Sequence, residues 1–275
     1  MTDSTTLLRL TGRDALAVLH RIATQKLDDL APGEARATCF CDFRGRLLHR
    51  AAVAMTRDHT AWLLRADAPG EPLAEFIERH VFREDVKIDV RADAAIHVRY
   101  DVQPDDAGVG LATERDGRPH ELRVSAHESL TVAAPGTTPA PNERLRIRAF
   151  GVRDRHEVHE DFTPFEIGLA REVHLSKGCF TGQEALLRLV TYESVRRQLV
   201  RLDGDGAPPA PRARVTHAGE PVGVVTSVTA DGGGFAALAV VKRTVVEARS
   251  LLAIEGVAAP ATVHAAPLER PLGVA

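Results

Sequence analysis

Cysteine, lysine and glycine residues crowd into the stretch Ser176–Glu184, directly before an apolar run. Thr181 and Glu184 have the spacing of a capping box, in which each side chain binds the other residue's backbone N–H, so the sequence predicts a helix that starts just after Thr181. Cys179 then lies upstream of a helix N-terminus, where partial positive charge favours a thiolate, and Lys177 adds an ammonium nearby. This setting suits a nucleophile, a redox thiol or a ligand, and also a small residue in a tight turn.

A single carboxylate, Glu166, lies in the otherwise apolar segment Thr163–Leu169. Burying an unpaired carboxylate is costly, so we expect Glu166 either to accept hydrogen bonds from the protein or to bind a ligand that presents N–H donors. The edge of an aminopyrimidinone ring, such as that of a pterin, offers such donors. Further along, Arg196 and Arg197 could bind a ligand carboxylate or phosphate, although surface arginines are usually just solvated.

Two other groups of chemically active residues favour structural roles. Cys39 and Cys41 alternate with Phe40 in a predicted strand, which places both thiols on one face, and we interpret them as buried apolar residues instead of a metal or redox pair. The segment His156–Asp161 lacks the spacing of a helical zinc motif and is expected to be a solvated loop. We therefore predict no metal site and, with three cysteines, no disulfide framework.

The composition of the 275-residue chain is that of an ordinary globular protein, with 44% hydrophobic and 27% charged residues. A formal net charge of -3 gives no global electrostatic argument for binding nucleic acid or membranes, and we expect neither as a direct partner. The sequence shows no secretory signal pattern and no apolar run of the roughly 18 residues that a membrane helix needs. These features favour a cytoplasmic protein.

Helices and antiparallel strands are expected to alternate irregularly. An amphipathic helix should run to about Ala23, and a hairpin with its tip at Arg44–Gly45 should join strands over 35–43 and 46–55. Further strands are expected over 60–65, 129–133 and 195–202, with two more between 85 and 100, and further helices after Pro69–Gly70 and over 142–151.

The segment 204–211 is rich in proline and glycine and marks the clearest linker of the chain. Beyond it, short β-type runs with glycine-rich turns predict a small all-β barrel in the last part of the chain. We therefore expect an α+β protein with two domains, an α+β body over 1–203 and a C-terminal β-barrel over 212–275.

Several motifs, in this order along the chain, resemble the YgfZ branch of the superfamily that includes the glycine-cleavage T-protein, an aminomethyltransferase. The most specific is the cysteine signature K-G-C-[FY]-x-G-Q-E, which is intact at Lys177–Glu184. The others are G-x-D-A at Gly12–Ala15, L-x-P-G at Leu30–Gly33, R-G-R-[IL] at Arg44–Leu47, P-x-E-x-G-L at Pro164–Leu169 and G-x-[IV]-T-S at Gly223–Ser227.

The resemblance implies a tetrahydrofolate-binding body of two interlocked subdomains and a C-terminal barrel, arranged around a central channel. It implies a part in making or repairing iron–sulfur proteins, including radical enzymes that modify tRNA, with folate and iron–sulfur client proteins or assembly factors as partners. Glu166 matches the carboxylate that binds the pterin, Arg197 is expected to hold the acidic tail of the folate, and Cys179 is the expected functional thiol. The other residues expected at the cofactor are Lys177, Gln183 and Glu184 of the signature.

The chain also departs from the family at two places. Thr24–Lys26 stands where the family has T-N-D, and the hairpin segment Gly45–Arg50 lacks the aspartates of the transferases' G-G-I-x-D-D. Without a carboxylate there, an obvious acid or base for aminomethyl transfer is missing. The leading hypothesis is a folate-binding accessory protein for iron–sulfur cluster assembly or repair, and the alternatives are a folate-dependent methyl- or aminomethyltransferase or demethylase, and a thiol redox sensor. The leading hypothesis requires Cys179 and Glu166 to open onto the same pocket.

Overall fold

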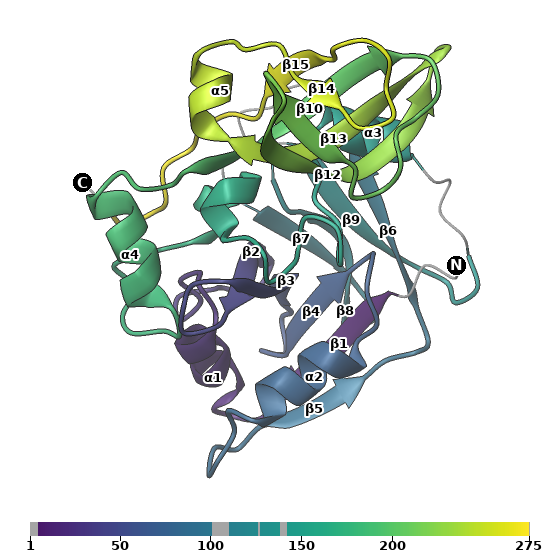
Figure 1. Ribbon diagram of the computed structural model, residues 1–275. Helices are drawn as coiled ribbons and strands as arrows, with labels where there is room; N and C mark the ends of the chain where they lie inside the picture. Colours follow the sequence, from purple (N-terminus) through teal and green to yellow (C-terminus); the bar gives the residue numbers. More distant parts are fainter. Residues whose placement is uncertain (1–4, 101–109, 126, 138–141, 275) are drawn as a thin grey trace.

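The computed structural model describes residues 5–100, 110–125, 127–137 and 142–274, and their strands form two antiparallel sheets (Figure 1). The larger sheet has nine strands in the order β5-β1-β4-β3-β2-β7-β8-β9-β6. These strands are β1 (Thr6–Thr11), β2 (Glu34–Cys41), β3 (Leu47–Met55), β4 (Ala61–Arg65), β5 (Lys87–Val90), β6 (Ala95–Tyr100), β7 (Gly110–Arg115), β8 (Arg118–Arg123) and β9 (Glu128–Ala133). The predicted α+β class is confirmed.

The nine-stranded sheet is buried on both faces. On one face it carries α1 (Ala15–Ile22) and α2 (Glu71–Glu78), whose Leu19 and Leu73 pack with Leu63 of β4. Both helices place apolar residues three or four positions apart, which gives each a single stripe to bury. The opposite face buries residues from strands along the whole sheet, namely Leu7, Trp62, Ile96, Leu122 and Leu130.

The smaller sheet has six strands in the order β14-β11-β12-β13-β10-β15, and its two edges meet. An antiparallel bridge joins Leu252 to Ala261, directly before the edge strands β14 and β15, so the sheet closes into the small barrel that the sequence predicts. The elements are β10 (Arg197–Asp205), β11 (Arg214–His217), β12 (Glu220–Asp231), β13 (Gly234–Lys242), β14 (Ala253–Ile254) and β15 (Thr262–Ala265), with α5 (Arg243–Glu247) between β13 and β14.

Strand β13 is buried on both sides because it separates two cores. Ala237 and Ala239 face the inside of the barrel, whereas Leu238 and Val240 pack against the rest of the protein. This is the period-2 alternation of a strand, with both sets apolar. Strand β10 extends to Asp205, so the predicted linker begins later than expected, and the barrel sheet already starts at Arg197. The division of the chain into domains near residue 203 remains a prediction.

The segment between the sheets holds four short helices, α3 (Glu143–Arg148), η1 (Pro164–Ile167), η2 (Ala170–Glu172) and α4 (Gln183–Thr191). Asn142 caps α3 by accepting a hydrogen bond from the N–H of Leu145 at 3.1 Å. Figure 1 shows α3 against the barrel and α4 at the outer edge of the molecule. No helix of the described residues is long and apolar enough to cross a membrane.

The barrel is attached to α3 through a fully buried carboxylate. Glu157 has no exposed surface and accepts hydrogen bonds from Arg146 of α3 at 3.1 Å and from Thr226 and Ser227 of β12 at 2.5 and 2.7 Å. A buried charge needs such partners, because desolvation without them costs several kcal/mol. The acidic residue that the sequence assigns to a solvated loop is therefore a structural group, and this part of the prediction is wrong.

Candidate functional site: a central cavity

The cysteine signature folds into a loop that leads into α4. The helix begins at Gln183, as expected, but the predicted capping box of Thr181 and Glu184 is absent, because Gly182 in a left-handed conformation (φ 85°) takes the N-cap position. Glu184 pairs with Arg188 on the helix surface at 2.5 Å instead. Gln183 donates a hydrogen bond to the carbonyl of Leu175 at 2.8 Å, which holds the loop together.

Gly182 also allows α4 to approach the tip of the β2–β3 hairpin. A Cβ atom at this position would collide with the carbonyl oxygen of Asp42, so only glycine permits the contact. Leu186 of α4 lies against Gly45 at the same tip. The signature and the arginine-rich hairpin are therefore packed together, although they are far apart in the sequence.

Lys177 of the signature is buried and bound to α1. Its ammonium donates a hydrogen bond to the carbonyl of His20 and lies 5.0 Å from the centre of the Phe180 ring. His20 in turn contacts the carbonyl of Lys177 through Nε2 at 3.2 Å. Burial lowers the pKa of Lys177 to about 8. Cys179 itself is exposed to solvent.

Glu166 is fully occupied by protein partners. Arg197 donates to its two carboxylate oxygens at 2.7 and 3.0 Å, and the N–H of Thr163 donates at 2.9 Å in a capping box at the start of η1. Arg46 lies 3.6 Å away and adds a second positive charge. Of the two interpretations that the sequence leaves open for Glu166, the structure shows the one in which the protein itself satisfies the carboxylate.

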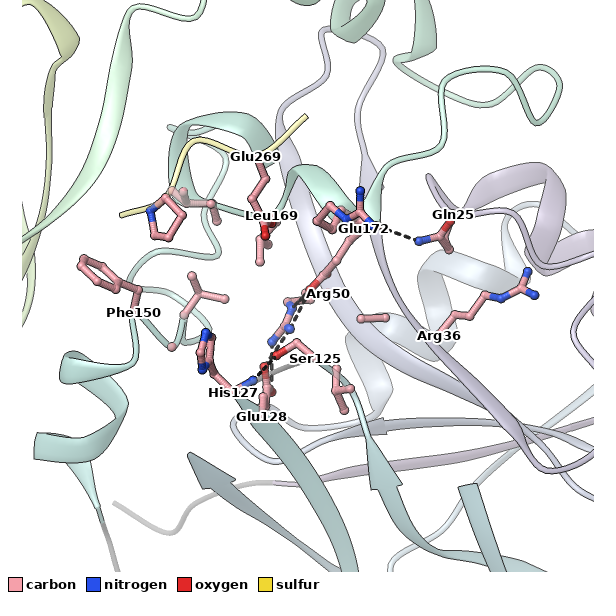
Figure 2. A pocket seen from close by; sticks show the side chains of 18 of the residues that line it. Gln25, Arg36, Arg50, Ser125, His127, Glu128, Phe150, Leu169, Glu172 and Glu269 are labelled. Atoms are coloured by element: carbon pink, nitrogen blue, oxygen red, sulfur yellow. Dashed lines mark hydrogen bonds and ion pairs between the residues drawn. The ribbon is translucent and has the colours of Figure 1, made fainter. Parts of the chain in front are cut away.

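A cavity of about 970 Å³ opens between the nine-stranded sheet, the segment with η1 and η2, and the residues after β15 (Figure 2). This is the size of a large small-molecule site. Seven lysine and arginine side chains line it, against four aspartate and glutamate side chains. Its apolar wall includes Val124, Phe150, Val152, Ile167, Leu169 and Leu272.

The predicted site residues do not line this cavity. Glu166 is followed directly by three residues that do, Ile167, Gly168 and Leu169, but its carboxylate points to Arg197. The expectation that Cys179 and Glu166 open onto one pocket is therefore wrong for this cavity. The functional roles assigned to the six predicted residues remain predictions; these residues are Lys177, Cys179, Gln183, Glu184, Glu166 and Arg197.

The floor of the cavity is an ion-pair network that the sequence did not reveal. Arg50 donates to Glu172 from Nε and Nη2 at 3.0 and 2.7 Å, and to Glu128 from Nη1 and Nη2 at 3.1 and 2.8 Å (Figure 2). The Cys39 thiol lies 3.6 Å from the carboxylate of Glu172. Burial by itself lowers the pKa of Arg50, but the carboxylates of Glu128 and Glu172 raise it by more, so the net shift is upward. Arg50 is 78 residues from Glu128 and 122 from Glu172 in the sequence, so no local pattern marks the network.

The two strand cysteines lie where the sequence places them. Cys39 and Cys41 are buried in the same hydrophobic core, and burial raises the pKa of both thiols. The described residues contain no group of three or more His, Cys, Asp or Glu side chains arranged to hold a metal ion. The cavity lining itself contains charged, polar and apolar side chains.

Comparison with solved structures defines the class of the fold. The chain matches the crystal structure of the glycine cleavage system aminomethyltransferase T from Bartonella henselae with a TM-score of 0.72 and 18% sequence identity, over 98% of this chain and 85% of that one. It thus has the α+β fold of a glycine-cleavage aminomethyltransferase.

Sequence comparison finds relatives that each match part of the chain. The chain is 31% identical over 154 residues to a chloroplastic protein of Arabidopsis thaliana named as a transferase, and 43% identical over 86 residues to the aminomethyltransferase of Moorella thermoacetica. These matches cover 54% and 31% of this chain. The chain spans only 35% and 23% of the length of these two relatives. No family model matches the sequence.

Proposed function

We propose that this protein binds a reduced folate in the central cavity and serves as an accessory factor for the assembly or repair of iron–sulfur proteins. The observation that carries the folate half is the cavity itself, which combines an apolar wall with an excess of cationic side chains in a fold shared with an aminomethyltransferase. Tetrahydrofolate has a flat, largely apolar ring system and an acidic tail, so it needs both kinds of surface.

The acidic tail fits two arginines in the cavity wall. Arg197, the residue first expected there, uses Nε and Nη2 to bind Glu166 and the carbonyl of Asp161, and it does not line the cavity. Arg171 and Arg270 both line the cavity, and within the described residues their guanidinium groups make no hydrogen bond or ion pair. Arginine binds carboxylates in a bidentate manner, and these two side chains are available for it.

The accessory function is favoured over group transfer by the position of Arg50. The matching point of the transferase hairpin carries a carboxylate, whereas Arg50 places a permanent cation there and binds Glu128 and Glu172 on either side. A guanidinium cannot serve as a base at neutral pH. A folate-dependent methyl- or aminomethyltransferase or demethylase remains the second candidate, because the sequence relatives are named as transferases.

Cys179 is the basis for the iron–sulfur half of the proposal. It is exposed and stands on the packed loop between Lys177 and α4, where a client protein or assembly factor could reach it. A thiol redox sensor would use the same exposed group. The cytoplasmic location stays a prediction, and the Arabidopsis relative is named as chloroplastic.

Two measurements test the proposal. Calorimetric titration with 5-formyltetrahydrofolate should give a dissociation constant in the micromolar range, and no heat at high micromolar ligand would reject the folate half. Cells that carry only the Cys179→Ala protein should lose activity of iron–sulfur enzymes, with Cys41→Ala as the matched control. Unchanged activity in the Cys179→Ala cells would reject the accessory function, and formation of methylenetetrahydrofolate and ammonia from tetrahydrofolate and an aminomethyl donor would favour the transferase.

A further inference from the structure

The segment that follows β15 forms one side of the cavity. It is attached at two points, by the N–H of Ala266 to the carbonyl of Leu199 at 3.1 Å and by the N–H of Leu272 to the carbonyl of Val173 at 2.8 Å. Between these attachments, the backbone of residues 267–271 makes no hydrogen bond to any described residue. The side chain of Glu269 in this segment points into the cavity, toward Leu169 (Figure 2).

Glu269 differs from every other acidic side chain in the cavity wall. Asp29 is paired with Lys26 and Arg36, and Glu128 and Glu172 are both paired with Arg50. Within the described part of the chain, the carboxylate of Glu269 makes neither a hydrogen bond nor an ion pair.

The surroundings of Glu269 make ionisation unfavourable. The side chain is accessible because it faces the open cavity, yet the protein around it desolvates the carboxylate and raises its pKa. The negative charge of Glu172 acts in the same direction, whereas Arg171 and His127 oppose it without forming an ion pair with Glu269. A partly desolvated carboxylate with no protein partner gains more from a ligand that supplies N–H donors than a carboxylate that is already paired.

We propose that Glu269 is the carboxylate that binds the N–H edge of the ligand's ring in the central cavity, and that the segment Ala266–Leu272 carries it there. The proposal rests on the proposed function and deepens it. An aminopyrimidinone presents two adjacent N–H donors, which match the two oxygens of one carboxylate. The oxygens of Glu166, by contrast, already accept from Arg197 and Thr163.

Ligand binding at Glu269 should also restrain the segment Ala266–Leu272. A ring bound to Glu269 provides the third attachment of a stretch that otherwise has two. Binding should therefore restrain residues 268–270, whose N–H groups have no backbone partner among the described residues, and slow their exchange with solvent. Pro267 and Pro271 flank these residues and have no amide proton to exchange.

The test uses Glu269→Gln, with Glu220→Gln on the exposed surface of β12 as the control. The probes are 5-formyltetrahydrofolate, 6-methyltetrahydropterin, which has the ring alone, and p-aminobenzoylglutamate, which has the tail alone. Glu269→Gln should weaken binding of the first two by about tenfold or more and leave the third within twofold, because only the ring edge loses a charged acceptor. The control should bind all three as the wild type does.

Three outcomes would overturn the proposal. One is unchanged affinity of Glu269→Gln for the two ring-bearing probes, and another is an equal loss for the tail alone. The third is ligand-induced slowing of amide exchange at residues 268–270 that is the same in Glu269→Gln and wild type. If the wild-type protein binds none of the three probes, the proposed function itself fails, which is a distinct result.

Discussion

Arg197 donates to both carboxylate oxygens of Glu166, from Nε at 2.7 Å and from Nη2 at 3.0 Å, and the two residues come from β10 and η1. The pair thus joins the first barrel strand to the segment that lines the central cavity. From the sequence, Glu166 is expected to bind the ring of a folate and Arg197 its acidic tail. In the structure the two side chains bind each other.

We expect Glu166→Gln to affect stability more than ligand binding. The substitution leaves the guanidinium of Arg197 without its charged partner, although a glutamine oxygen can still accept from Thr163, so the free energy of unfolding should fall by about 2 kcal/mol. Urea titration measures the loss. Affinity for 5-formyltetrahydrofolate should stay within threefold of wild type, and a stable Glu166→Gln protein that no longer binds the folate would contradict this assignment.

Arg50→Gln should be among the most destabilising substitutions in the cavity. It leaves two poorly exposed carboxylates, Glu128 and Glu172, close together without a counter-charge, and breaking a buried ion pair in this way costs roughly 3–5 kcal/mol. Glu128→Gln in the Arg50→Gln background should recover part of the stability, because it removes one of the two charges. If the double variant is less stable than Arg50→Gln by the full cost of Glu128→Gln alone, the residues are not coupled.

Lys177 predicts a pH dependence of stability with a defined sign. Its pKa is about 8 in the folded protein against 10.5 as the ordinary value, so between these values the unfolded chain binds more protons, and stability contributed by this residue rises with pH. The cost of the buried ammonium is present in full below pH 8 and disappears by about pH 10.5.

The measurement compares wild type with Lys177→Met, which keeps an apolar side chain next to Phe180. Each pKa unit corresponds to about 1.4 kcal/mol, so wild-type stability relative to Lys177→Met should rise by roughly 2 kcal/mol from pH 7.5 to pH 10. A difference that is flat across this range would show that Lys177 is not desolvated.

The three thiols should separate cleanly in a labelling experiment. Cys179 is exposed, whereas Cys39 and Cys41 are buried and burial raises the pKa of their thiols. At pH 7.5 the folded protein should release one equivalent with Ellman's reagent, and in guanidinium chloride three. The Cys179→Ala protein should release none when folded. Fast labelling of that variant would mean that the hairpin core opens.

Local patterns in the sequence predict much of the fold. The stripe of α1, the hairpin around Gly45, the Asn142 cap and the barrel strands all depend on neighbours within a few residues, which a sequence displays directly. The capping box illustrates the limit. The same Thr-x-x-Glu spacing occurs at Thr163 and at Thr181, yet only the first forms, because Gly182 packs against the hairpin tip.

The cavity could not be predicted in this way because its charged groups meet across long distances in the chain. Arg50 is 122 residues from Glu172 and 78 from Glu128. Glu269 follows the barrel, and in the sequence it resembles any surface glutamate. A motif marks residues that lie close together in sequence, so it identified Glu166, whose partners are near the cavity but do not face it.

The attachment of Leu272 to Val173–Leu175 has a consequence for biosynthesis. The N–H of Leu272 binds the carbonyl of Val173 at 2.8 Å, and the N–H of Leu175 binds the carbonyl of Leu272 at 2.9 Å. The N-terminal sheet emerges from the ribosome long before these last contacts can form, and domains generally fold in the order of their synthesis. The side of the cavity that residues 267–271 form is therefore completed only after Leu272 has been synthesised, and under our proposal the ring contact with Glu269 also waits for that step.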